Sequence, residues 1–114
     1  MNSFKEAGIG LPETGSILLL HVVYTIAAGK REEFYNKLHD YGIIEKSRQE
    51  NGNFQYDYYF PADNENDILL VELWSGVQAQ KNHLATAHYQ ELQALKREYV
   101  VHVEIEKYIA EKMA

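Results

Sequence analysis

The run from Ser16 to Ile26 constrains the fold most, because nearly every side chain in it is apolar or β-branched. A strand with one solvated face alternates between apolar and polar side chains, and this run has almost no such alternation. The run therefore predicts a strand that is covered on both faces. A chain of 114 residues has room for one domain, so a second copy of the chain is the simplest cover for one of those faces.

Helical periodicity follows twice, over residues 30–49 and residues 77–98. The first predicted helix is weakest near Gly42. The second carries an apolar stripe that consists of Leu84, His88, Leu92 and Leu95. Since His83 precedes His88 by five residues, about 140° around a helix, we expect these two imidazoles to point in different directions.

Three further segments alternate as strands do. Residues 54–60, which follow a turn signal, are aromatic on one face. Residues 68–74 place Glu72 on the same face as Trp74, because side chains alternate along a strand. Residues 99–109 alternate between aliphatic and polar side chains, which is typical of a half-exposed strand.

The resulting order is strand, helix, strand, strand, helix, strand, which makes two βαβ units joined by a hairpin. It predicts a ferredoxin-like α+β sandwich, in which a four-stranded antiparallel sheet carries both helices on one face. This single domain spans residues 16–114 and follows an N-terminal extension of residues 1–15. The extension has the pattern of neither a signal peptide nor a membrane span, so we expect a cytoplasmic protein with no membrane partner.

Charge and cysteine content exclude several classes of function. The chain has 11 Lys and Arg against 17 Asp and Glu, a net charge of -6, which has the wrong sign for binding nucleic acid. It has no cysteine, which excludes disulfides, thiolate nucleophiles, iron–sulfur clusters and cysteine-ligated zinc. His83 and His88 lack the spacing that would put two metal ligands on one helix face, so the sequence predicts no metal site.

Four short segments carry a family resemblance. They are Gly29–Phe34, Asn51–Tyr56, Val71–Trp74 and Ala87–Tyr89. The most specific feature is a Glu-x-Trp strand that is followed, fourteen residues after the tryptophan, by His88 and an aromatic residue. With these segments, residues 16–109 resemble the antibiotic biosynthesis monooxygenase family. The resemblance implies a dimeric α+β barrel, a homodimer that forms through the sheet face.

Members of this family that oxidise quinols or polycyclic phenols use neither metal, flavin nor haem, because the substrate itself supplies electrons to O2. The resemblance therefore implies a monooxygenase without a cofactor, whose partners are O2 and a small aromatic or quinol-like substrate. It makes His88 the candidate general base and Glu72 the carboxylate that orients it. The candidate substrate-binding residues are Trp74, Tyr56, Tyr58, Phe54 and Tyr24.

Each of these assignments has a structural alternative. His88 is either a base or a core histidine that one hydrogen bond satisfies. Glu72 either orients His88 or serves as a buried anchor. Trp74 is also a simple core residue. We expect His21 to pack in a dimer, and the histidines expected at the surface or rim are His39, His83 and His102.

Three other functions remain to be weighed. The haem-degrading relatives use an Asn in the first strand, where Val22 stands here, so haem is disfavoured. An isomerase of the signal-processing type would need a cation for its phosphorylated substrate, and Lys30 and Lys81 are the candidates. A non-catalytic dimeric barrel that binds a hydrophobic ligand explains the aromatic residues equally well. A cavity bounded by the candidate base, its carboxylate and the tryptophan would favour catalysis.

Overall fold

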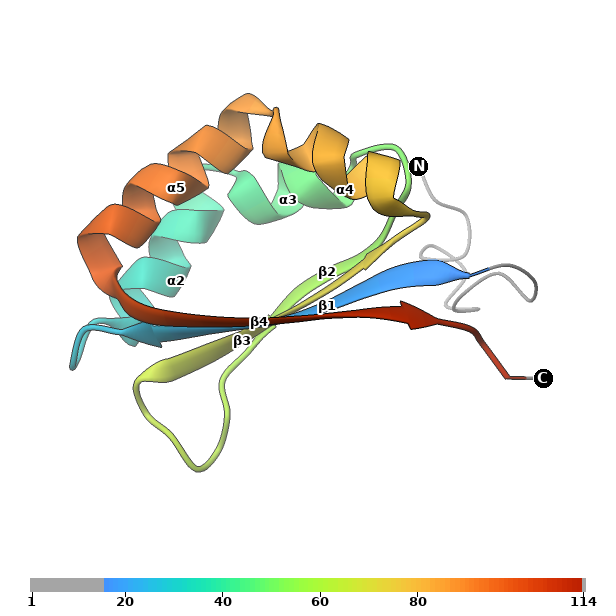
Figure 1. Ribbon diagram of the computed structural model, residues 1–114. Coiled ribbons are helices and arrows are strands. Elements are labelled where there is room, and N and C mark those ends of the chain that lie inside the picture. The colour runs from blue at the N-terminus through green and yellow to red at the C-terminus, as the bar shows by residue number, and fades with distance from the viewer. Residues whose placement is uncertain (1–15, 114) are drawn as a thin grey trace.

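The computed structural model describes residues 16–113, and these form one antiparallel sheet with the helices on one face (Figure 1). The elements are β1 (Ile17–Ile26), α2 (Arg31–Asp40), α3 (Ile43–Arg48), β2 (Asn53–Tyr59), β3 (Asp67–Trp74), α4 (Val77–Leu84), α5 (Ala87–Tyr99) and β4 (Val100–Ala110). The strand order in the sheet is β2-β3-β1-β4, which confirms the ferredoxin-like sandwich. The predicted N-terminal extension lies outside the described residues.

The first predicted helix is divided at Gly42, the point where its pattern is weakest. Gly42 has a φ of +69°, in the left-handed region that glycine adopts without steric cost. Helix α2 ends just before it, and α3 begins with Ile43. The change of direction lets both short helices bury apolar side chains on the sheet, among them Phe34 and Ile44.

The second predicted helix is divided as well, at a point where its apolar pattern continues without a break. Thr86 has an extended conformation, and its hydroxyl oxygen accepts a hydrogen bond from the backbone N–H of Tyr89 at 3.1 Å. Threonine in this role is a favoured N-cap, so a new helix, α5, starts here. The expectation of one continuous helix is therefore wrong at its centre. Leu84 ends α4 and is exposed, whereas Leu92 and Leu95 of α5 are buried as predicted.

Strand β3 places its side chains as its alternation predicts. Ile68, Leu70, Glu72 and Trp74 are buried toward the helices, while the residues between them are half-buried on the opposite face. Strand β1 alternates in the same way, with Leu20, Val22 and Tyr24 toward the helices. Within one chain only one face of β1 is thus fully covered. The outer face of the sheet is where the predicted second cover would have to lie.

Strand β2 is aromatic on its inner face over only part of its length. Tyr56 and Tyr58 share that face, and their hydroxyl oxygens lie 3.4 Å apart. The pairing of β2 with β3 shifts between Asn53 and Gln55, which is a β-bulge that falls on Phe54. Phe60 follows the end of β2 and is exposed. The aromatic residues expected on one face, Phe54, Tyr56, Tyr58 and Phe60, therefore do not form one continuous wall.

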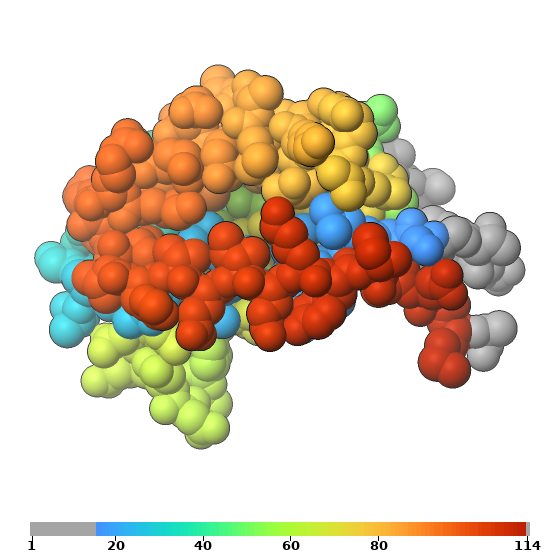
Figure 2. All heavy atoms as spheres, viewed as in Figure 1, coloured from blue at the N-terminus to red at the C-terminus, as the bar shows by residue number. Residues whose placement is uncertain are grey.

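Strand β4 forms one edge of the sheet, and most of its side chains are exposed. Figure 2 shows it along the front of the molecule, with α4 and α5 above it. The longest helix within residues 16–113 is α5, with 13 residues, and no helix there is long and apolar enough to cross a membrane.

Candidate functional site

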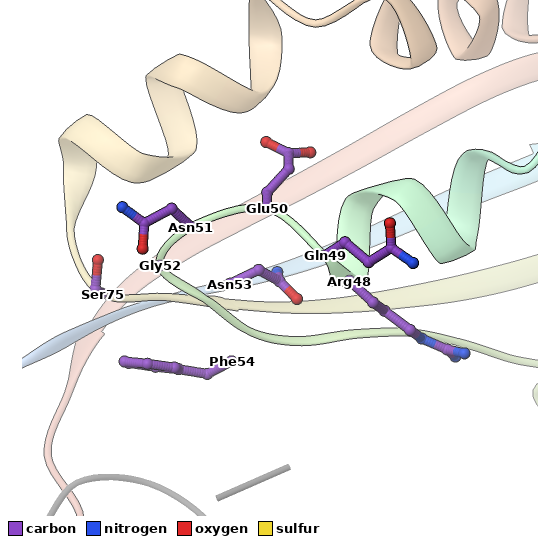
Figure 3. A pocket seen from close by; sticks show the side chains of 8 residues that line it. All are labelled: Arg48, Gln49, Glu50, Asn51, Gly52, Asn53, Phe54 and Ser75. Carbon is purple, nitrogen blue, oxygen red and sulfur yellow. The ribbon is translucent and has the colours of Figure 1, made fainter. Parts of the chain in front are cut away.

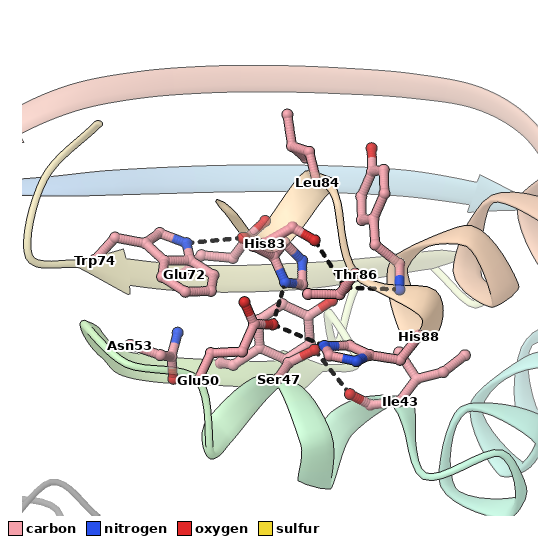
Figure 4. Close-up of polar contacts among 12 residues, drawn as sticks. Ile43, Ser47, Glu50, Asn53, Glu72, Trp74, His83, Leu84, Thr86 and His88 are labelled. Atoms are coloured by element: carbon pink, nitrogen blue, oxygen red, sulfur yellow. Dashed lines mark hydrogen bonds and ion pairs between the residues drawn. The ribbon is translucent and has the colours of Figure 1, made fainter. Parts of the chain in front are cut away.

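A carboxylate and two imidazoles meet between the helices and the sheet (Figure 4). Glu50 lies in the loop between α3 and β2, His83 in the last turn of α4, and His88 in the first turn of α5. The Oε2 atom of Glu50 lies 2.5 Å from Nδ1 of His83 and 2.7 Å from Nε2 of His88. The side chains of Glu50, His83 and His88 are 13%, 2% and 11% exposed. We call these three residues the Glu50 cluster.

The position of His83 corrects two expectations. His83 is buried, not at the surface or rim, and it shares a carboxylate oxygen with His88 instead of pointing away from it. The cause is the break at Thr86, which turns α5 relative to α4. The angle of about 140° expected between His83 and His88 holds only within one continuous helix. Thr86 also donates its hydroxyl hydrogen to the backbone carbonyl of His83 at 2.8 Å, which ties the break to the cluster.

The carboxylate that orients His88 is Glu50 and not Glu72. Glu72 lies on β3 and accepts a hydrogen bond from the indole Nε1–H of Trp74 at 3.0 Å. Glu50 is separated from His83 by 33 residues and from His88 by 38, and it stands in a loop without periodicity. No local signal marks such a residue, so reasoning from the sequence missed it.

The hydrogen bonds of the Glu50 cluster determine how the imidazoles are arranged. Burial opposes ionisation of the Glu50 carboxyl, but the hydrogen bonds from His83 and His88 outweigh this effect and lower its pKa. An ionised carboxylate only accepts hydrogen bonds, so each imidazole donates an N–H to it. In their neutral forms His83 therefore has an unprotonated Nε2 and His88 an unprotonated Nδ1. Both nitrogens are available as proton acceptors.

Glu72 differs from Glu50 in its electrostatic environment. Its side chain is buried, and this burial raises its pKa, while the hydrogen bond from Trp74 acts in the opposite direction and is the smaller effect. Three tyrosines near it carry no charge: Tyr24 and Tyr56, which are buried, and Tyr58, which is half-buried. The site thus contains two carboxyl groups whose surroundings shift their pKa values in opposite directions, a pattern common in acid–base sites.

Aromatic rings surround His83. Its ring centroid lies 4.9 Å from that of Trp74, 5.5 Å from that of Tyr56 and 5.2 Å from that of Tyr89. Trp74 and Tyr56 are fully buried. Rings packed in this way hold the imidazole in a single orientation.

The other candidate substrate-binding residues lie at different distances from the cluster. Tyr58 contacts the ring of Tyr56, at 5.8 Å between centroids. Tyr24 packs on Phe34 in the core, at 6.2 Å. Phe54 points away from Glu50, as Figure 3 shows. The structure thus brings Trp74 and Tyr56 to the imidazoles, and it leaves Phe54 outside that group.

A cleft of about 460 Å³ opens beside the cluster (Figure 3). It is lined by Arg48, Gln49, Glu50, Asn51, Gly52, Asn53, Phe54 and Ser75. Its lining includes Glu50 but not His88, Glu72 or Trp74. The Glu50 carboxylate therefore stands between the cleft and the two buried imidazoles.

Gly52 gives the loop beside this cleft its tight path. Its φ is +85°, and a Cβ there would lie 2.6 Å from the Ser75 hydroxyl oxygen. Only glycine fits such a position without moving the backbone. The backbone N–H of Ser75 donates to the carbonyl of Gly52 at 2.7 Å, and this hydrogen bond holds the loop that carries Glu50 against the end of β3.

The remaining histidines lie where the sequence places them. His39 is exposed and pairs with Glu45 at 2.8 Å, and His102 is exposed on β4. His21 lies on the outer face of the sheet, where its ring meets that of Tyr108. Lys30, a candidate phosphate anchor, forms an ion pair with a glutamate at the start of α2.

The chain is similar to several known proteins. Residues 17–95 match the family model described as antibiotic biosynthesis monooxygenase. The chain is 34% identical over 74 residues to "Putative monooxygenase YcnE" of Bacillus subtilis (strain 168). The aligned region covers 65% of this chain and 76% of that protein.

Solved structures share the fold. PA3566 from Pseudomonas aeruginosa superposes with a TM-score of 0.77 at 22% identity, over 89% of this chain and 100% of that one. Rv0793 from Mycobacterium tuberculosis gives a TM-score of 0.75 at 21% identity, over 86% and 98%. Since the family match spans most of the folded domain and the fold agrees with it, the chain belongs to the antibiotic biosynthesis monooxygenase family.

Proposed function

We propose that this chain is a monooxygenase that oxidises a quinol-like or phenolic small molecule with O2 and needs no metal or flavin. The observation that carries the proposal is the Glu50 cluster, in which an ionised carboxylate accepts hydrogen bonds from two imidazoles, and one of these, His83, lies against the rings of Trp74 and Tyr56. Family membership supports the reaction class. The substrate class is the one that the family resemblance implies, and the aromatic rings around His83 support it.

The reaction needs a base and an electron-rich substrate. Removal of the phenolic proton gives a phenolate, which donates an electron to O2 more readily than the neutral phenol does. When a ring carbon–hydrogen bond ortho or para to a hydroxyl is oxidised, one atom of O2 becomes a carbonyl oxygen and the other leaves as water. The two hydrogens in that water come from the substrate, so no external reductant is consumed. The protein supplies the base, the orientation and a site from which water is excluded.

His88 is the proposed general base and acts through its Nδ1, because its Nε2 donates to Glu50. Glu50 takes the positioning role that the sequence suggests for Glu72. Glu72 supports Trp74, whose indole N–H donates to its carboxyl oxygen, and burial raises the pKa of this carboxyl. Trp74 and Tyr56 are the proposed walls of the substrate site.

Tyr58, Tyr24 and Phe54 stay predictions as substrate contacts. Tyr58 contacts the ring of Tyr56, which in turn lies against His83. Phe54 lines the cleft through which a substrate would approach Glu50. His83 is the second candidate base, because its ring is the one in contact with both Trp74 and Tyr56. A comparison of variants at the two histidines decides between them.

We propose in addition that two chains pack through the outer faces of their sheets. In β1 and β3 these faces carry half-buried aliphatic side chains that no element within residues 16–113 covers, Leu19, Val23, Leu69, Val71 and Leu73. Burial of such a face on a second copy removes apolar surface from water. The result is the dimeric barrel that the family resemblance implies.

The first experiment measures O2 uptake by chelator-treated protein with a panel of hydroquinones and naphthalenediols. We expect uptake above spontaneous autoxidation, and we expect His88→Ala to lower its rate by about 10²- to 10⁴-fold, the usual contribution of a general base. His39→Ala is the matched control, since His39 also pairs with a glutamate but on the exposed surface.

Two outcomes would contradict the proposal. Uptake that His88→Ala leaves unchanged but His83→Ala abolishes would move the base to His83. No uptake with any member of the panel would favour the non-catalytic barrel, in which the same rings bind a ligand without oxidising it.

A further inference from the structure

We propose that the Glu50 cluster is a binding site for a divalent transition-metal cation of the Zn²⁺ type. Nδ1 of His83, Nε2 of His88 and a carboxylate oxygen of Glu50 all lie within 4.8 Å of one another. Within residues 16–113 this is the only group of three such side chains close enough to share one ion. The three ligands come from one loop and two helices, so the arrangement exists only in the folded chain.

The donor atoms determine which ions fit. Two imidazole nitrogens and one carboxylate oxygen form a set that Zn²⁺ and its neighbours in the first transition series bind well. Mg²⁺ and Ca²⁺ prefer a shell of oxygen atoms, which this cluster does not offer. The chemistry of the site therefore selects against the two most abundant divalent ions.

The geometry requires the carboxylate and the imidazoles to shift, because their three ligand atoms lie within 4.8 Å of one another and not yet at equal tetrahedral separations. Bonds of about 2.0–2.2 Å in a tetrahedral shell would hold the ligand atoms roughly 3.3 Å apart. The Glu50 oxygen now lies 2.5 Å and 2.7 Å from the two nitrogens, so it would retreat by less than about 1 Å. Binding exchanges two N–H···O hydrogen bonds for two metal–nitrogen bonds, and in each imidazole the proton moves, by exchange with water, from the ligating nitrogen to the other ring nitrogen, so both ligands stay neutral.

The surroundings allow this movement and provide a route for the ion. Glu50 belongs to a loop and lines the open cleft, so its carboxylate has space to shift toward solvent. The two imidazoles are held more firmly, His83 by the rings of Trp74 and Tyr56 and His88 within α5. Two imidazoles on neighbouring helices and one adjustable carboxylate beside a solvent cleft leave the fourth position for water.

The metal site does not depend on the proposed oxygenase activity, because binding is measured without any substrate. An ion at this site would occupy the nitrogens that now donate to Glu50 and would change the orientation of the proposed base. We therefore expect the Zn²⁺-loaded protein to lose the O2 uptake that the chelator-treated protein shows. The titration tests the metal site and the O2-uptake assay tests the oxygenase, so the failure of one does not decide the other.

The test is a calorimetric titration of ZnCl2 into the full-length, chelator-treated protein. We expect one saturable site per chain, and we expect His88→Asn and Glu50→Gln to weaken its affinity by more than about tenfold, the lower bound for the loss of an outer partner of a metal ligand. His39→Asn removes the imidazole of an exposed histidine–glutamate pair and should leave the affinity unchanged. Excess MgCl2 should not displace the ion.

A spectroscopic measurement keeps the proposal testable if a variant unfolds. Wild-type protein titrated with CoCl2 should develop the intense visible absorption of a four-coordinate Co²⁺ site, and an equimolar amount of ZnCl2 should abolish it. Absence of a saturable heat and of this absorption would overturn the proposal. Equal affinities in folded His88→Asn and His39→Asn proteins, or displacement by MgCl2, would overturn it too.

Discussion

Glu50 and Glu72 lie on the same side of the sheet, yet their surroundings shift the pKa values of their carboxyl groups in opposite directions. Glu50 accepts hydrogen bonds from two imidazoles, which lower its pKa despite its burial. Glu72 has the indole N–H of Trp74 as its hydrogen-bond partner, and burial dominates and raises its pKa. One carboxyl group is thus kept ionised, while the other is made easier to protonate.

The raised pKa of Glu72 predicts how Glu72→Gln changes stability with pH. In the wild type the raised folded-state pKa adds stability that is fully present below the unfolded-state pKa and is lost as pH rises through the folded-state pKa. The amide that replaces this carboxyl carries no charge and still offers Trp74 a carbonyl oxygen. We expect the variant to gain stability relative to the wild type as pH rises from about 4 to about 8, measured by urea unfolding. A difference that is flat or falls with pH would contradict this, and Glu91→Gln on the exposed face of α5 is the control.

Two interruptions of helical structure shape the site at the scale of elements. Gly42 divides α2 from α3, and α3 then leads directly into the loop that carries Glu50. Thr86 divides α4 from α5 and brings His83 and His88 to the same carboxylate. Without these breaks the two helices would run straight over the sheet. The site therefore depends on residues that take no part in its chemistry.

Thr86→Ala should destabilise the protein by about 1 kcal/mol, the typical cost of a lost threonine N-cap. The backbone N–H of Tyr89 and the carbonyl of His83 would both lose their hydroxyl partner. Thr86→Ser keeps that hydroxyl and should stay close to the wild type. Urea unfolding of both variants gives the comparison, and equal losses in the two would show that the cap contributes nothing.

The whole molecule has one well-covered sheet face and one open face. The helices lie together on the inner face, and the outer face carries half-buried aliphatic side chains along β1 and β3 (Figure 1). The edge strand β4 projects with most of its side chains exposed (Figure 2). A second copy of the chain that covers the outer face would explain why β1 is apolar on both sides.

Sedimentation equilibrium at micromolar concentration should give twice the chain mass of 13.2 kDa. Val71→Lys places a charge at the centre of the outer face and should shift the protein toward the monomer, because burial of an unpaired charge is costly. Ala94→Lys, on the exposed surface of α5, should leave the mass unchanged. A wild type that sediments as a monomer would contradict the barrel, and a dimeric Val71→Lys protein would place the interface elsewhere.

Sequence patterns predicted the four strands, the two helical segments and their order, but not the division of each helical segment into two helices. Alternation along residues 68–74 predicted that Glu72 and Trp74 lie on the same buried face, and the structure confirms it. The family resemblance is confirmed by the family model that residues 17–95 match. The face on which a side chain lies is a local feature, because it follows from the position of the residue within one strand or helix.

The tertiary structure alone decided the site. Glu50 stands 33 and 38 residues from its two imidazole partners, in a loop without a periodic pattern, so no local rule connects them. The break at Thr86 interrupts an apolar pattern that continues through it, so the pattern alone does not show that this threonine caps a new helix. Local patterns record which face of an element is buried, whereas the meeting of distant side chains depends on how the elements pack together.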